Sequence, residues 1–145
     1  AFSAVDEFEV RIRPHPAFSL ERVIEAAPLG NREFFKASPG SLADDIEWAD
    51  VVLYATSTVG LEAVSLGTPA VQIDLGEFLN TDPMFGWEEF KWSVKEPSQL
   101  VETLRGIENL TDSEYLDRQR KGQEYTAAYL RPVTPDSLRL FSETT

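Results

Sequence analysis

The chain has 145 residues, a net charge of −12 at pH 7 and no cysteine. This length suits one domain with a sizeable core, so a single domain over residues 1–145 is expected. The acidity argues against nucleic acid as a partner, because phosphate backbones bind to basic surfaces. Disulfides and thiolate metal sites are excluded, because both need cysteine.

Short apolar runs alternate with helical patterns along the whole chain. The predicted strands are residues 9–13, 34–37, 51–55, 70–74 and 92–94. Hydroxyl residues and prolines mark the predicted helix starts. These starts are Ser19, Ser41, Ser57 or Thr58, Pro97 or Ser98, Thr111 and Thr134. Thr111 and Glu114 have the spacing of a capping box, which predicts a helix running towards Tyr129.

The segment 50–74, with the sequence DVVLYATSTVGLEAVSLGTPAVQID, predicts a β-α-β unit. Its first run, VVLYA, is typical of a strand buried on both faces of a parallel sheet. The hydroxyl-rich turn Thr56-Ser57-Thr58 then opens a helix that Gly67 is expected to end. Backbone N–H groups and the positive end of the helix dipole meet at such a turn, so it predicts an anion site, with phosphate the expected ligand.

Strands that alternate with helices predict a three-layer, Rossmann-like α/β domain with a parallel sheet of about four or five strands. Ligands of such sheets bind outside the carboxyl ends of the strands. Two predicted strands end in unusual polar sequences, RPHP at 13–16 and TST at 56–58. We therefore expect both segments to face the same crevice.

The order of three motifs resembles the C-terminal half of GT-B glycosyltransferases. These motifs are RPHP, the segment STVGLEA and the sequence GTP before the next strand. The chain most resembles bacterial capsule and surface polysaccharide synthesis proteins, and the bacterial sialyltransferases and glycerophosphotransferases that share an HP motif and a downstream Ser/Thr pair. The resemblance covers roughly residues 9 to 107, and the combination is moderately specific, whereas HP alone is weak.

In that family this domain binds the nucleotide-sugar donor, here expected to be CMP-, CDP- or UDP-linked. The resemblance implies that His15 contacts the donor phosphate or nucleotide, and that Ser57 and Thr58 hold phosphate oxygens. It implies that Glu62 approaches a ribose hydroxyl, and Gly60 belongs to the same binding set. No metal, no cofactor and no catalytic residue is assigned.

The family also has an N-terminal domain that binds the acceptor and usually carries the catalytic carboxylate. We expect this chain to lack that domain and the opening β-α unit of its own domain. Alone, it is then expected to bind a nucleotide weakly and to transfer nothing. An apolar face exposed in this way predicts self-association, with the aromatic segment from Phe78 to Trp92 as the candidate.

Each candidate residue also has a purely structural interpretation. His15 lies between two prolines and would cap a turn, and one hydroxyl of Ser57 or Thr58 would cap the helix. Glu62 lies among apolar residues and would form a salt bridge. The aromatic side chains from Phe85 to Trp92 are expected in the core or in an interface rather than in an acceptor platform. Asp44 and Asp45 are expected at a solvated helix start.

Two other functions remain open. One is a sugar-nucleotide epimerase of the same overall fold, which needs further acid–base residues. The other is a non-catalytic nucleotide-binding or scaffold module. No signal peptide or membrane-spanning stretch is visible in the sequence, so a cytoplasmic location is expected, with peripheral contact with the inner membrane left open.

Overall fold

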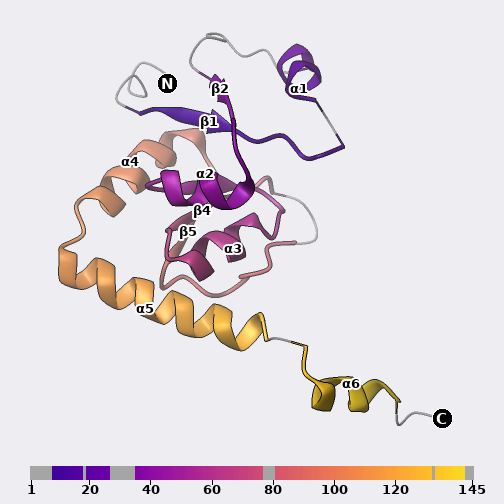
Figure 1. Ribbon diagram of the computed structural model, residues 1–145. Coiled ribbons are helices and arrows are strands. Elements are labelled where there is room, and N and C mark those ends of the chain that lie inside the picture. Colours follow the sequence, from indigo (N-terminus) through magenta and orange to yellow (C-terminus); the bar gives the residue numbers. More distant parts are fainter. Residues whose placement is uncertain (1–7, 18, 27–34, 77–80, 132, 143–145) are drawn as a thin grey trace.

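The computed structural model describes residues 8–17, 19–26, 35–76, 81–131 and 133–142. Strands and helices alternate through most of this part of the chain (Figure 1). The strands are β1 (Val10–Ile12), β2 (Phe35–Ala37), β3 (Val52–Tyr54), β4 (Ala70–Ile73) and β5 (Lys91–Val94). The helices are α1 (Leu20–Ala26), α2 (Leu42–Trp48), α3 (Val59–Leu66), α4 (Pro97–Glu108), α5 (Asp112–Tyr129) and α6 (Pro135–Ser142). The α/β class predicted from the sequence is confirmed.

The described strands form two small parallel sheets. One sheet is the pair β1-β2, and the other has the order β3-β4-β5. All five predicted strands are present, each within a residue or two of the predicted bounds. A run of strand, helix and parallel strand fits the crossover connections expected from the sequence.

The position of β3 differs from the prediction. The run VVLYA predicts an interior strand, but β3 pairs with β4 alone and therefore lies at an edge of its sheet. β1 likewise pairs with β2 alone. Among the described residues no strand lies between β1 and β3, so the single sheet of four or five strands is not formed by this part of the chain.

Helices pack against the three-stranded sheet through two clusters of apolar side chains. Ala70 belongs to a cluster with Val64 of α3 and the buried ring of Phe90, which Tyr115 of α5 meets edge-on. Val71 belongs to a second cluster with Ile107 of α4. Successive residues of a strand point to opposite faces, so these clusters cover different sides of β4.

The helix ends follow the signals in the sequence. Ser41 caps α2 and Thr111 caps α5, each in a capping box with the acidic residue three positions on. Gly67 ends α3 with a φ of 92°, a left-handed conformation that glycine adopts without steric cost. Local hydrogen-bond chemistry therefore placed these boundaries.

A buried ion pair lies beside β3, and nothing in the sequence pattern indicated it. Lys91 Nζ donates to Asp82 Oδ2 at 2.7 Å, and both side chains are almost fully buried. The hydroxyl of Tyr54 donates to Asp82 Oδ1 at 2.7 Å, and the Met84 amide donates to the same oxygen at 3.0 Å. Asp82 thus joins β3, β5 and the segment before β5.

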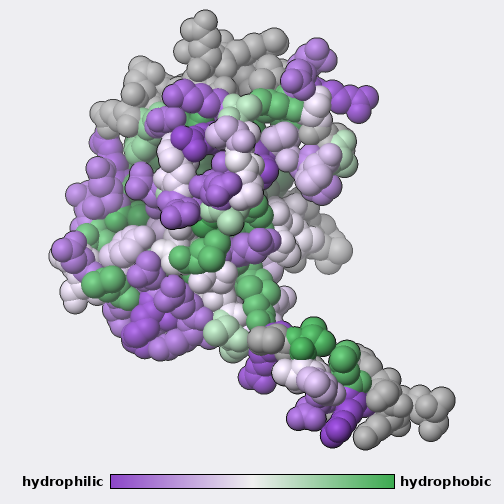
Figure 2. Space-filling view, viewed as in Figure 1, coloured by the Kyte–Doolittle hydropathy of each residue, from purple (hydrophilic) through white to green (hydrophobic). Residues whose placement is uncertain are grey.

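α6 projects away from the rest of the molecule beyond the end of α5 (Figure 1). Figure 2 shows apolar side chains along the segment where α5 passes into α6. The exposed apolar residues there are Tyr129, Leu130, Val133 and Leu138. The packed body of the described structure therefore ends near the C-terminus of α5.

Candidate functional site

The turn between β3 and α3 is exposed at all three hydroxyl residues, Thr56, Ser57 and Thr58. Ser57 Oγ accepts a hydrogen bond from the Val59 amide at 3.2 Å. Thr58 occupies the N-cap position, but its side chain forms no capping hydrogen bond. The Ser57 hydroxyl thus has the expected structural role at the helix start. The Thr58 hydroxyl accepts no hydrogen bond from a backbone amide of α3.

Gly60 has a packing role that the sequence does not reveal. A Cβ atom built on Gly60 would lie 2.4 Å from the ring of Tyr54, which is much closer than real Cβ atoms approach. The ring cannot move away easily, because its hydroxyl is bound to buried Asp82. Gly60 is therefore needed for α3 to pack on Tyr54, whether or not its amide also meets a ligand.

Glu62 lies one helical turn beyond Thr58 and is half-buried. Its carboxylate forms no ion pair or hydrogen bond with any side chain that the structure describes. The salt bridge considered from the sequence is thus not formed within the described part of the chain. A carboxylate in this position is an acceptor for hydroxyl or amide donors.

His15 follows β1 and is exposed. The Ala17 amide donates to His15 Nδ1 at 3.2 Å, so the turn-capping interpretation is confirmed. Because Nδ1 accepts in this bond, the neutral ring carries its proton on Nε2. The turn thereby makes Nε2 a hydrogen-bond donor, which suits a phosphate oxygen as acceptor.

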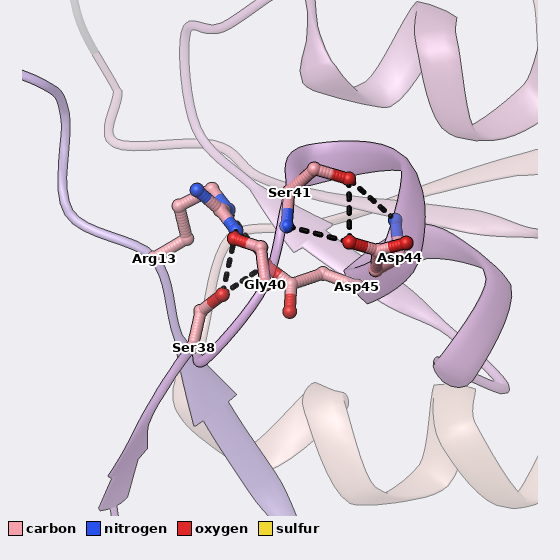
Figure 3. A network of polar contacts seen from close by, with 6 residues as sticks. All are labelled: Arg13, Ser38, Gly40, Ser41, Asp44 and Asp45. Carbon is pink, nitrogen blue, oxygen red and sulfur yellow. Dashed lines mark hydrogen bonds and ion pairs between the residues drawn. The ribbon is translucent and has the colours of Figure 1, made fainter.

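Arg13 fixes the segment that carries His15. Its guanidinium donates from Nε to Asp45 Oδ2 at 2.6 Å and from Nη2 to Ser38 Oγ at 2.6 Å, and it also contacts the Gly40 carbonyl. Figure 3 shows Arg13 reaching from the end of β1 towards the start of α2. The arginine therefore ties the carboxyl ends of β1 and β2 to one helix.

Asp44 and Asp45 were both expected at a solvated helix start, and this prediction is correct for Asp44 alone. Asp44 is exposed and closes the capping box with Ser41. Asp45 is mostly buried beneath Arg13, and its Oδ1 has no partner among the described residues. This oxygen is an acceptor that an O–H or N–H donor would satisfy. The arginine before PHP was the signal that could have indicated the pair.

The two predicted halves of the site lie at the ends of strands that belong to different sheets. RPHP follows a strand of one sheet, and Thr56-Ser57-Thr58 follows a strand of the other. Their convergence on one crevice therefore stays a prediction.

The aromatic segment before β5 is divided between core and surface. Phe90 is fully buried, Trp92 is half-buried, and Trp87 stacks on Tyr125 of α5 with 4.6 Å between ring centroids. Phe85 is 72% exposed, and Phe78 lies outside the described residues. Core packing thus accounts for most of the described aromatic side chains of this segment, whereas Phe85 is exposed.

Comparison with protein-family models, curated proteins and solved structures finds no match to this chain. Within the described residues, no group of three or more His, Asp or Glu side chains could hold a metal ion. In the same part of the chain no helix is long and apolar enough to cross a membrane. The functional assignment therefore depends on the geometry and chemistry of the residues themselves.

Proposed function

We propose that this chain is the donor-binding half of a glycosyltransferase that acts in surface or capsular polysaccharide synthesis. The observation that carries the proposal is the exposed hydroxyl turn between β3 and α3, in which Thr58 forms no capping bond. A parallel strand that ends at a helix N-terminus is where α/β domains bind phosphate groups. The resemblance of the RPHP, STVGLEA and GTP motifs to the GT-B family supports the same function.

Each predicted residue has a chemical role in this proposal. Ser57, Thr58 and the amides around Gly60 bind phosphate oxygens at the positive end of α3. His15 donates from Nε2 to the phosphate or nucleotide, on a segment that Arg13 holds in place. Glu62 accepts from a ribose hydroxyl, which would satisfy a half-buried carboxylate. The donor is expected to be CMP-, CDP- or UDP-linked.

A thermal-shift panel with CMP, CDP, UDP and GDP and their sugars tests the proposal. The unfolding temperature should rise with at least one of these ligands. A ligand present at about 100 times its dissociation constant stabilises a fold by about 2.7 kcal/mol. If no member of the panel raises the unfolding temperature at millimolar concentration, the nucleotide-binding assignment is wrong.

Two variants distinguish a loss of nucleotide binding at the site from a general loss of stability. The double variant Ser57→Ala/Thr58→Ala should weaken nucleotide binding at least tenfold, because both hydroxyls face the proposed phosphate. Ser65→Ala is the matched control, since its hydroxyl donates to the Glu62 carbonyl within the same helix. If the double variant and the control bound the nucleotide with equal affinity, the hydroxyl turn would not be part of the binding site.

Residues 1–145 alone should bind the donor and transfer no sugar, because the donor is held without an acceptor or a catalytic base. Assays of donor hydrolysis and sugar transfer measure this directly. Transfer by residues 1–145 would show that the chain carries its own catalytic residues. Nucleotide binding without any sugar preference would instead favour the non-catalytic nucleotide-binding module.

A further inference from the structure

Among the described residues, β3 has an open edge, although it has the composition of an interior strand. Its residues and their neighbours, Val51 to Ala55, contain no charge and no proline. Edge strands of natural sheets usually carry such features, because they prevent pairing with other chains. At the opposite edge of this sheet, β5 has exposed Ser93 and is followed by exposed Lys95. The two edges of one sheet therefore differ in chemistry, and the β3 edge is the unprotected one.

β3 also exposes an apolar side chain, that of Leu53, on one face of the sheet. Leu53 pairs in register with Val71 on the adjacent strand. Val71 is fully buried under α4, but Leu53 is 42% exposed. The helical cover of this face thus ends between β4 and β3, where a further helix would bury Leu53.

The order of the strands indicates what the open edge lacks. The commonest doubly wound sheet has the order 3-2-1-4-5-6, with its first strand in the centre. The two sheets of this chain, β2-β1 and β3-β4-β5, reproduce that order without the central strand. Every described pairing is parallel, as that fold requires.

α2 connects the two sheets along the chain and contacts residues of both. The guanidinium of Arg11 in β1 stacks 3.6 Å over the ring of Trp48 at the end of α2. The Ile46 carbonyl of α2 accepts from the hydroxyl of Thr68, two residues before β4. Figure 1 shows α2 between the β1-β2 pair and α3. One short helix thus contacts both sheets.

We infer that a single β-strand inserts between β1 and β3, parallel to both, and that the helix after it covers Leu53. The occupant is a strand–helix segment that precedes Ala1 in the natural protein. A parallel connection to β1 needs such a crossover helix, and the right-handed crossover rule places that helix against one face of the sheet. The two sheets then become one six-stranded sheet, independently of the ligand it binds.

Hydrogen exchange at single amides tests this insertion. The Val52 amide donates to the Pro69 carbonyl, so the next amide, that of Leu53, points to the open side. The Phe90 and Val94 carbonyls accept from the Ala70 and Asp74 amides, so the Ser93 amide points away from β4 at the far edge. Residues 1–145 are compared with the protein expressed from its complete reading frame. We expect exchange of the Leu53 amide to slow at least tenfold in the complete protein, with the Ser93 amide unchanged.

A pair of charge variants tests the same edge by stability. Leu53→Asp should shift the unfolding midpoint of residues 1–145 only slightly but should lower that of the complete protein clearly. Ser93→Asp, the matched control, should have the same effect in both proteins. Equal exchange of the Leu53 amide in the two proteins would overturn the inference, as would a reading frame with no polypeptide before Ala1. If exchange of the Leu53 amide slowed as the concentration of residues 1–145 was raised, the edge would instead pair with a second copy of the chain.

Discussion

Asp82 accepts from Lys91, Tyr54 and the Met84 amide in the interior, and its position affects the ionisation of the groups around it. Burial alone would raise the pKa of this carboxyl group. Hydrogen bonds from Lys91, Tyr54 and the Met84 amide outweigh burial, so the pKa lies below the ordinary value of 3.8. Burial raises the pKa of the Tyr54 phenol, and the bond to Asp82 adds to this effect. Tyr54 therefore stays a neutral donor, and Asp82 stays charged.

Replacing Lys91 tests how much this ion pair matters. Lys91→Met should lower the free energy of unfolding by about 3 kcal/mol, because a buried carboxylate then loses its counter-charge. Chemical denaturation followed by circular dichroism measures the change. Lys121→Met is the control, because Lys121 forms exposed ion pairs with Glu89 and Asp117 and should behave nearly as wild type.

The double variant Asp82→Asn/Lys91→Met adds a second measurement. It removes both charges together, so it should be more stable than Lys91→Met alone. A double variant that is less stable than the single one would show that the carboxylate stabilises the fold without its lysine partner.

At the scale of elements, α3 is placed by Tyr54 at one end and by α5 along its side. The Tyr54 ring occupies the space beside Gly60. Gly122 of α5 is buried against Val64 of α3 in a similarly close approach. α3, which opens at the proposed phosphate site, is thus held rigidly against the body of the molecule.

Gly60→Ala should destabilise the protein by roughly 1–3 kcal/mol, because the added methyl group overlaps a ring that Asp82 holds in place. The control is Gly106→Ala in α4, where no atom lies within 4 Å of the new methyl group. That change should stabilise the protein by up to about 1 kcal/mol, because alanine favours helix. Denaturant titrations of both variants decide the comparison. If both glycine changes stabilise the protein, Tyr54 does not pack closely beside Gly60 in solution.

At the scale of the whole molecule, the described structure consists of a packed body and a projecting C-terminal helix. Val133 before α6 and Leu138 within it are both exposed. The ion pair of α6 between Arg139 and Asp136 lies within the helix itself. An amphipathic helix of this kind usually gains its stability from a surface that covers its apolar side.

Removing all residues after Arg131 should leave the unfolding temperature within about 2 °C of that of the full 145 residues, because exposed segments contribute little to stability. Differential scanning calorimetry of the two chains measures this. A drop of more than about 5 °C would show that α6 packs on the body in solution.

The sequence alone determined the elements and most of their ends. Ser41, Thr111 and Gly67 mark boundaries because capping is local, with both partners within a few residues of each other. Apolar runs likewise located all five strands, and the hydroxyl turn of the candidate site lies where β3 meets α3. These features needed no knowledge of distant contacts.

Only the tertiary structure decided how these elements are joined. Three contacts join residues that no repeating pattern in the sequence links. They are the ion pair of Lys91 with Asp82, the ion pair of Arg13 with Asp45, and the packing of the Tyr54 ring beside Gly60. The edge position of β3 also depends on tertiary structure. The composition of a strand indicates how buried the strand is, but it does not indicate which strand or helix lies beside it.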